Sequence, residues 1–226
     1  MKKSCWILLS SVIFLFSCSK DEETVVPDTS AEYAGLEVGK YVVFDVDSIT
    51  YNDFDSSIDT ASYQIKEMVD SKFTDLEGDE AFKLIRYRRD SATQNWLIID
   101  VWTSKITLTN FQKTEENINY VKLIFPVREG KVWDGNSRNN SSTQDYEYTA
   151  VDQAEVIGGN TLAEVLTVLQ YDSPDKLINP EFFEEKFAKG VGLVYKRSSS
   201  LVRADLNPTT PWLGYVVTMT LSTYGG

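Results

Sequence analysis

The chain of 226 residues contains no histidine and only two cysteines. Without histidine, a Ser-His-Asp triad, a Cys-His nucleophile and a histidine-ligated zinc site are excluded. Cys5 directly precedes the apolar N-terminal run and Cys18 follows that run, so no cysteine pair is left for a disulfide in the rest of the chain. The folded part therefore depends on its core, and we expect neither a metal nor a cofactor.

Basic residues are in the minority, with 22 Lys and Arg against 34 Asp and Glu. Residues 1–17 hold two of the lysines and no acid, so the remaining chain has 20 basic and 34 acidic residues and a formal charge of −14. A field of that sign repels polyanions. Nucleic acid is therefore not an expected partner.

Long apolar runs are also scarce, and the one at the N-terminus is short. Lys2 and Lys3 precede the eleven-residue run WILLSSVIFLF, residues 6–16, and the charged sequence KDEE follows at residues 20–23. A membrane-spanning helix needs about 20 apolar residues, whereas a basic start and a short apolar core are typical of a secretory signal. We predict that residues 1–17 are a signal peptide.

The junction Leu15-Phe16-Ser17-Cys18 resembles the bacterial lipobox, although Phe16 is bulkier than the residue usual at its place. The resemblance implies that Cys18 carries diacylglycerol and a further acyl chain such as palmitate. Two or three chains anchor a protein firmly, because each buried methylene contributes about 0.8 kcal/mol. The alternative is an ordinary signal peptide followed by an unmodified thiol.

The next residues resemble the acidic export signal of Bacteroidota-type lipoproteins. The sorting signal would consist of Ser19, Lys20, Asp21, Glu22 and Glu23. Serine after the lipidated cysteine favours the outer membrane, and the acidic stretch implies export to the cell surface. The periplasmic face of the outer membrane is the alternative location.

Residues 18–34 are polar, interrupted by Pro27 and without a regular pattern, so we predict a lipidated cysteine followed by a flexible tether. Residues 35–226 are predicted to form a single β-rich domain, which is long enough to bury a core. In its first strand Val42, Phe44 and Val46 alternate so that they lie on one side. Further alternating runs and Gly/Asn/Asp turns predict a mostly β fold: a strongly curved antiparallel sheet, half-barrel or sandwich-like.

One short helix is predicted over residues 179–190, NPEFFEEKFAKG. Asn179 can cap it, Pro180 suits its first turn and Gly190 suits its C-terminal end. The helix would pack on the sheet. Residues 162–171 fit either a helical stripe or a strand, and their many strand-forming residues favour the strand.

Two patches, LIFPVREGKVWDGN at residues 123–136 and EKFAKGVGLVYKR at residues 185–197, resemble a pattern in uncharacterised Bacteroidota-type outer-membrane lipoproteins. The resemblance contains no catalytic motif. It implies a curved antiparallel sheet with a packed helix, similar to the half-barrel of periplasmic lipoprotein carriers.

Aromatic residues supply the candidate binding site. Trp96 and Trp102 are expected on one strand face, and Trp133 and Trp212 add two further rings on which a glycan could stack; core packing is the alternative. The acidic run of residues 45–59 suggests Ca²⁺ binding. However, the sixth and twelfth residues counted from Asp53 do not fit the EF-hand pattern. A solvated hairpin is the simpler interpretation.

These features favour a non-catalytic binding or interaction module, anchored to the membrane, whose ligand is a glycan or a hydrophobic small molecule. A carrier of lipid or other hydrophobic cargo in a half-barrel cavity is the alternative. A carboxylate-dependent glycoside hydrolase is a third, but the sequence carries no specific signal for it, because among 34 acids some suitably spaced pair is expected by chance. The protein partner and the oligomeric state are not indicated.

Overall fold

The computed structural model describes residues 30–207 and 209–226. A short 3-10 helix, η1 (Ser30–Ala34), precedes twelve strands. The strands are β1 (Tyr41–Tyr51), β2 (Ile58–Thr74), β3 (Glu80–Arg89), β4 (Leu97–Ile106), β5 (Asn110–Glu115), β6 (Ile118–Ile124), β7 (Val132–Asp134), β8 (Asp145–Ile157), β9 (Asn160–Asp172), β10 (Glu181–Ala188), β11 (Gly192–Val202) and β12 (Leu213–Gly225). Among the described residues, no helix has the length and apolar character needed to cross a membrane.

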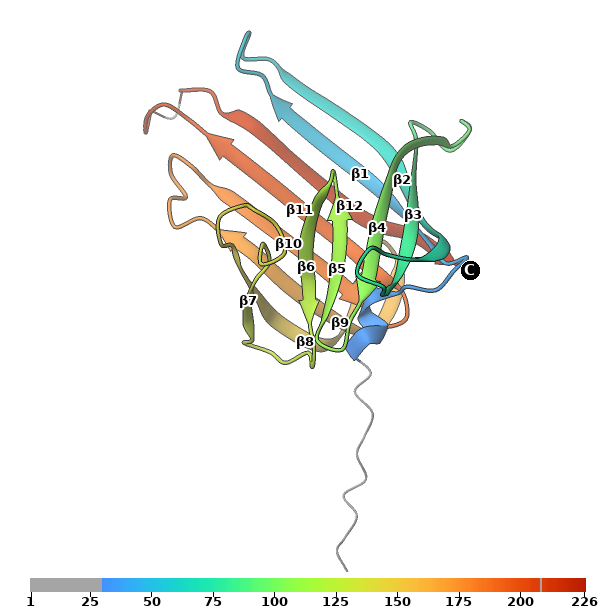
Figure 1. Ribbon diagram of the computed structural model, residues 1–226. Coiled ribbons are helices and arrows are strands. Elements are labelled where there is room, and N and C mark those ends of the chain that lie inside the picture. Colours follow the sequence, from blue (N-terminus) through green and yellow to red (C-terminus); the bar gives the residue numbers. More distant parts are fainter. Residues whose placement is uncertain (1–29, 208) are drawn as a thin grey trace, which may run out of the picture.

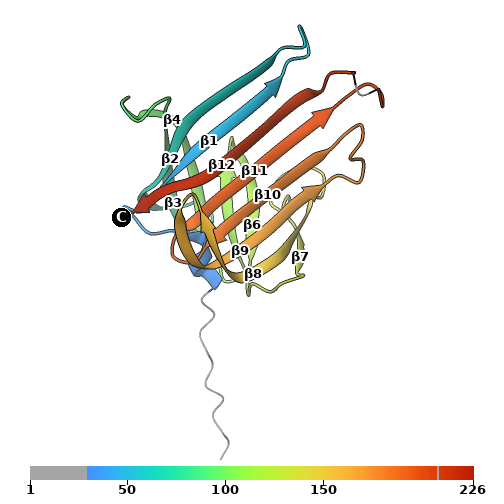
Figure 2. The ribbon, with the colours of Figure 1, turned by 180° about the vertical axis from the view of Figure 1, so that it is seen from behind.

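All twelve strands belong to one antiparallel sheet in the order β6-β5-β4-β3-β2-β1-β12-β11-β10-β9-β8-β7. The chain meanders outward from β1 to β6, crosses to the far edge at β7 and meanders back until β12 pairs with β1. The sheet curls strongly, so that β5 and β6 lie in front of β9 to β12 (Figures 1 and 2). The prediction of a strongly curved antiparallel sheet is confirmed.

The two edge strands meet along a seam. The Val121 amide on β6 donates to the Gly135 carbonyl at 2.9 Å, and the Trp133 indole donates to the Val121 carbonyl at 2.9 Å. The buried Tyr148 hydroxyl accepts from the Ile124 amide at 2.8 Å and donates to the Ile124 carbonyl at 2.9 Å. Side chains thus satisfy edge groups that would otherwise be free to pair with another chain.

The segment η1 closes one end of the curled sheet. Tyr33 and Ala34 are buried among side chains of β5, β6 and β8 to β10, and the Gly190 amide donates to the Glu32 carbonyl at 3.0 Å. Gly35 has a φ of +62°, and a Cβ there would lie 2.4 Å from the Val191 carbonyl oxygen, so only glycine fits. Residues Ser30–Ala34, which were predicted to be part of the tether, therefore pack against the sheet.

The predicted helix at residues 179–190 is wrong, because this segment forms β10 between β9 and β11. Glu185 and Phe187 point to the interior, where they are 1% and 3% exposed. Gly190, with a φ of +75°, lies in the turn to β11 rather than at a helix end. Pairing on both sides outweighs the local capping signals, since helix propensity is a weak prior. The strand prediction for residues 162–171 is confirmed by β9.

The first half of strand β4 is exposed on both faces. Leu97, Ile98 and Val101 are 69%, 63% and 59% exposed. The β5–β6 hairpin is too short to cover this part, because β5 pairs with β4 only from Thr103 to Ile106.

Candidate functional site

A layer of charged side chains crosses the interior of the curled sheet, and we call it the charge layer. Four positive residues, Arg86, Lys113, Lys122 and Lys196, face four negative ones, Glu67, Asp100, Glu115 and Glu185. The Lys122 ammonium lies 2.9 Å from Glu185 and 3.2 Å from Glu115. Lys196 lies 3.1 Å from Glu185, and Lys113 lies 2.7 Å from Glu67. The layer is formally neutral.

Burial and pairing act in opposite directions on these groups. Burial by itself would raise the pKa of Glu115, but the attraction of Lys122, Lys196 and Lys113 outweighs it and holds that pKa well below its usual range. Burial would lower the pKa of Lys122, but Glu115 and Glu185 hold it well above its usual range. The pKa of Glu185 is lowered for the same reason as that of Glu115. All three groups are therefore ionised at neutral pH.

The interior on the η1 side of the charge layer is filled. Apolar clusters around Phe44, Leu123 and Leu84 occupy it, and the cavity between them and the charge layer measures about 40 Å³. That space holds on the order of three waters. One oxygen of Glu185, Oε2, is buried without a protein hydrogen-bond partner beside this cavity, which suits an ordered water. The interior on this side of the charge layer is thus packed rather than open.

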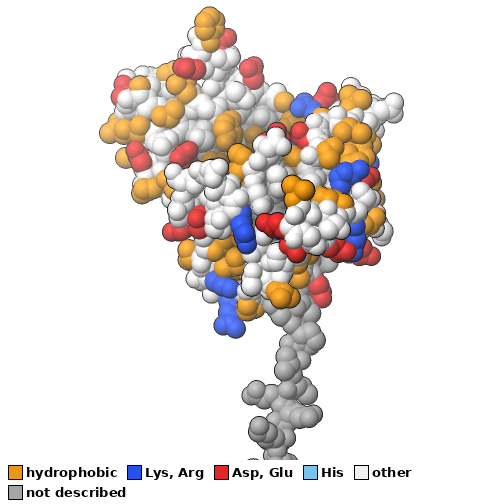
Figure 3. All heavy atoms as spheres, viewed as in Figure 1, with side chains coloured by type: hydrophobic (Ala, Val, Ile, Leu, Met, Phe, Trp, Pro, Cys, Tyr) orange, Lys and Arg blue, Asp and Glu red, His pale blue; other side chains and the backbone are white. Residues whose placement is uncertain are grey.

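On the other side of the charge layer lies an open recess of about 310 Å³, which we call the mouth pocket. Its lining residues come from β5, β6, the loop after β7, and β8 to β11: Glu115, Tyr120, Lys122, Asn136, Ser141, Gln144, Tyr146, Gln170, Tyr171, Phe183, Lys196 and Ser198. Along β10, Phe183 is five residues from Ala188, which at about 3.3 Å per residue is roughly 16 Å from the η1 end. Figure 3 shows the surface hollowed between the projecting strands and the hairpin in front of them.

A register shift places the central polar group of the mouth pocket. Phe183 on β10 pairs with Tyr171 and Glu184 pairs with Leu169, which leaves Gln170 as an extra residue on β9. Gln170 is 8% exposed, and its side-chain nitrogen Nε2 has no hydrogen-bond partner. A buried donor without a partner is costly and rare in native proteins. The mouth pocket therefore offers a ready hydrogen bond to a ligand.

Two rings form one wall of the mouth pocket. Tyr171 and Phe183 are cross-strand neighbours whose ring centroids lie 6.5 Å apart at an interplanar angle of 32°. Both are only partly buried, so they present a continuous apolar surface. On the facing strand β6, the ring of Tyr120 lies 5.2 Å from the Lys122 ammonium.

The rim of the mouth pocket is held by its own side chains. The Asp134 carboxylate accepts from the amides of Asn136 at 2.9 Å and Gln144 at 3.0 Å. The Gln144 side-chain nitrogen donates to the Gln170 carbonyl at 2.9 Å, and that of Asn139 donates to the Asn119 carbonyl at 2.9 Å. These contacts join the rim to β6 and β9, so the mouth pocket is pre-formed.

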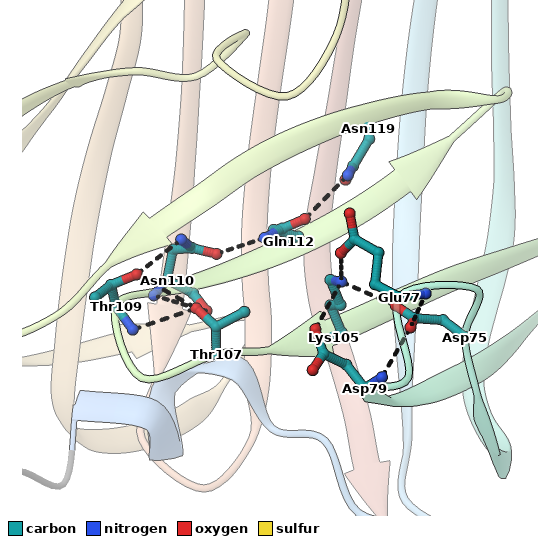
Figure 4. A network of polar contacts seen from close by, with 9 residues as sticks. All are labelled: Asp75, Glu77, Asp79, Lys105, Thr107, Thr109, Asn110, Gln112 and Asn119. Atoms are coloured by element: carbon teal, nitrogen blue, oxygen red, sulfur yellow. Dashed lines mark hydrogen bonds and ion pairs between the residues drawn. The ribbon is translucent and has the colours of Figure 1, made fainter.

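A second polar cluster lies on the outer face of β4 and β5, under the β2–β3 turn (Figure 4). The carboxylates of Asp75, Glu77 and Asp79 gather within 4.8 Å of one another, a spacing suited to a cation. The ammonium of Lys105 lies among them, 2.9 Å from Asp75 and 3.1 Å from Asp79 and in contact with Glu77. These contacts hold the pKa of Lys105 above its usual range. The lysine thus takes the place of a metal.

Similarity to known proteins is limited to the architecture. No protein-family model matches the chain, and no curated protein does. A crystal structure from Bacteroides fragilis, provisionally described as an exported protein with a YMCC-like fold, is 10% identical with a TM-score of 0.44, and covers 84% of this chain and 97% of that chain. A crystal structure from Parabacteroides distasonis, provisionally described as a lipoprotein, is 11% identical with a TM-score of 0.45, and covers 85% of this chain and 98% of that chain. Such distant similarity leaves function to be argued from the site.

The structure separates Trp96 and Trp102, which were expected on one face. Trp96 lies beside Arg89, 4.3 Å from its guanidinium, on the outer face, whereas Trp102 stacks on Arg86 of the charge layer at 3.7 Å. The cause is a register shift in the β3–β4 pairing, where Tyr87 opposes Ile98 and Arg86 opposes Asp100. One extra residue reverses the alternation.

The other two tryptophans also lie outside the mouth pocket. Trp133 is 8% exposed and packs against Tyr146 and Tyr148, so it is a core residue rather than a stacking platform. Trp212 is partly buried, with the Arg203 guanidinium 4.5 Å from its ring. The mouth pocket is lined instead by tyrosines and a phenylalanine.

The acidic run of residues 45–59 forms the β1–β2 hairpin. Asp45 accepts from Gln64 at 2.6 Å and Asp47 accepts from Ser62 at 2.6 Å, both across the strand pair. Asp55 caps the turn by accepting from the Ser57 amide at 3.0 Å. These contacts match the solvated-hairpin interpretation. The predicted lipid attachment at Cys18 and the sorting signal at residues 19–23 lie outside the described residues.

Sequence reasoning did not find the mouth pocket. Tyr171 and Phe183 become neighbours only through the β9–β10 register, and residue 183 was assigned to a helix. A local signal for this part of the chain is the even spacing of two aromatic residues, Tyr146 and Tyr148, at the start of β8.

Proposed function

We propose that this protein is a membrane-anchored, non-catalytic binding module that holds a small polar ligand in the mouth pocket. The observation that carries the proposal is the Gln170 side-chain nitrogen, buried without a partner in the wall of an open recess of about 310 Å³. Small-molecule sites are typically pre-formed recesses with a few converging polar groups.

The position of the mouth pocket agrees with an anchor at Cys18. The lipidated cysteine would precede Ser30 by twelve residues, a span of at most about 40 Å when extended. The chain enters the domain at η1, and the mouth pocket lies at the other end of the strands. An anchor on the outer membrane would then point the pocket away from the bilayer. Exposure at the cell surface is the location we favour, with the periplasmic face as the alternative.

The packed interior gives little support to a carrier of lipid or other hydrophobic cargo. A bound acyl chain needs an apolar cavity, usually of several hundred Å³, whereas the cavity among the apolar clusters measures about 40 Å³. The charge layer would also face the cargo.

A glycoside hydrolase is likewise disfavoured by the electrostatics. Its general acid must be protonated near neutral pH, which requires a raised pKa. Glu115 lines the mouth pocket and Glu185 contacts its lysines, and the pKa of both carboxyls is lowered by those lysines. The buried carboxylates serve here to pair lysines rather than to transfer protons.

The proposal is tested with Gln170→Met in the full chain, purified in detergent. A panel of neutral sugars, amino acids, nucleosides and octanoate is screened by thermal shift, followed by calorimetric titration of any hit. We expect a hit to bind the wild type and to lose about tenfold or more in affinity to the variant, because a buried hydrogen bond contributes roughly 1–3 kcal/mol when its partner is left unpaired.

The stability of the variant separates binding from structure. Removing an unpartnered buried amide should leave the unfolding free energy unchanged or higher, whereas a structural role would lower it. Gln153→Met, on the exposed part of β8, is the matched control. Equal affinity of wild type and Gln170→Met for every hit would refute the proposal.

A further inference from the structure

The floor of the mouth pocket is balanced in charge. Lys122 and Lys196 point to it from one side, and each lies within 4 Å of both Glu115 and Glu185. An anionic ligand would compete with Glu115 for Lys196, and a cationic ligand would compete with the two ammonium groups for the carboxylates. Either would break an existing buried pair, which is expensive. The floor therefore favours an uncharged ligand.

The wall of the mouth pocket favours a ligand with one flat apolar face. Tyr171 and Phe183 present two partly exposed neighbouring rings, whose planes are inclined to each other by 32°. A pyranose ring presents axial C–H groups on one face and matches such a surface by burying apolar area against it. A flexible acyl chain has no such face.

Polar groups border this aromatic wall. Gln170, whose Nε2 has no partner, lines the same recess as Tyr171, together with Ser198, Ser141 and the partly exposed Lys196. A wholly apolar ligand would strip water from these groups without replacing their hydrogen bonds. A ligand with hydroxyls around its edge satisfies them.

From these three features we infer that the mouth pocket binds an uncharged sugar residue, stacked on Tyr171 and Phe183 with a ring substituent accepting from Gln170. The inference rests on the proposed function and names its ligand class. A volume of about 310 Å³ is at the low end for ligand sites. It takes about one ring, and the rest of an oligosaccharide extends into solvent.

The test uses the full chain in detergent with three sets of probes. The uncharged set is glucose, galactose, N-acetylglucosamine and their disaccharides; the charged set is glucuronate and glucose 6-phosphate; the apolar set is octanoate. Binding is followed by saturation-transfer NMR and calorimetry. We expect at least one uncharged sugar to bind with millimolar or better affinity and its charged counterpart to bind at least tenfold more weakly.

Variants connect that binding to the wall. Tyr171→Ala and Phe183→Ala should each weaken it tenfold or more, and Gln170→Met should do so without loss of thermal stability. Phe54→Ala removes a ring that is 97% exposed at the β1–β2 turn and should change nothing.

Two outcomes overturn the inference in different ways. A charged sugar or octanoate that binds best, and loses affinity in Gln170→Met, refutes the sugar class but leaves the proposed binding function intact. If none of the three probe sets binds at concentrations up to about 10 mM, and the wider screen gives no hit, both the sugar inference and the proposed binding function are refuted.

Discussion

The protein contains two clusters in which a lysine lies among carboxylates, one inside the sheet and one outside. Lys122 is 3% exposed and contacts Glu185, which is buried with it, and Glu115, whose side chain is 14% exposed. Lys105 contacts three carboxylates, of which Glu77 and Asp79 are more than half exposed. The contacts are similar in distance, but the two clusters differ in their access to water.

Solvent decides what each cluster contributes. Outside, water and salt screen the attraction, so an exposed pair adds little to stability. Inside, a charge that loses its partner cannot be rehydrated. Removing one member of a buried pair is therefore strongly destabilising, even though the intact pair contributes little net stability. The charge layer should therefore affect global unfolding, whereas the Lys105 cluster should affect mainly the β2–β3 turn.

The largest expected effect is that of Lys122→Met. It leaves Glu115 and Glu185 without their nearest cation, and we expect the free energy of unfolding to fall by about 3–5 kcal/mol. Urea denaturation measures the loss. Lys122→Met combined with Glu185→Gln should be less destabilised than Lys122→Met alone, because one unpaired charge is removed as well. Additive losses in the double variant would show that the two residues are not coupled.

The pH dependence of stability should reverse between the wild type and Lys122→Met. In the wild type the folded-state pKa of Glu115 and of Glu185 is lowered, so their contribution is present above the unfolded value of about 4.3 and is lost as pH falls towards the folded value. In Lys122→Met, the effect of burial on the pKa of Glu115 and Glu185 should outweigh the remaining attraction, so protonation of these carboxylates should remove an unfavourable buried charge. Urea midpoints from pH 7 to pH 3.5 should fall for the wild type and stay level or rise for the variant. Parallel curves would contradict this account.

Much of the fold follows from local sequence. The alternation of Val42, Phe44 and Val46 predicts the inward face of β1, and the Gly/Asn/Asp turns predict the hairpins. The helix prediction for residues 179–190 failed because the capping residues are also suitable for a strand end and a turn. Which use prevails depends on β9 and β11, which lie on either side of β10.

The site was less predictable than the fold because it depends on register. A single extra residue in β4 places Trp96 and Trp102 on opposite faces, and another in β9 places Gln170 in the mouth pocket. Neither shift has a glycine or proline to mark it. The charge layer was also not predictable as a unit. Lys113, Glu115 and Lys122 lie at inward-facing strand positions of β5 and β6, but their charged partners come from β2, β10 and β11, which are distant in sequence.

The smallest expected effect is that of Lys105→Met, the outer counterpart of Lys122→Met. Screening of Glu77 and Asp79 by water should limit the fall in Tm to roughly 2–4 °C or less. The variant leaves three carboxylates within 4.8 Å and no ammonium among them. We therefore expect it to gain a weak Ca²⁺ site, with a dissociation constant on the order of 10⁻⁴–10⁻³ M.

Thermal unfolding with and without 5–10 times that concentration of Ca²⁺ checks the gain. The ion should restore the Tm of Lys105→Met and leave the wild type unchanged, because the lysine already occupies the position. Asp75→Asn in the Lys105→Met background is the control, since it removes the least exposed of the three carboxylates and should abolish the response. A Ca²⁺ response in the wild type equal to that of the variant would show that the ammonium does not take the place of a metal, and the contrast between the two lysines would then lie in burial alone.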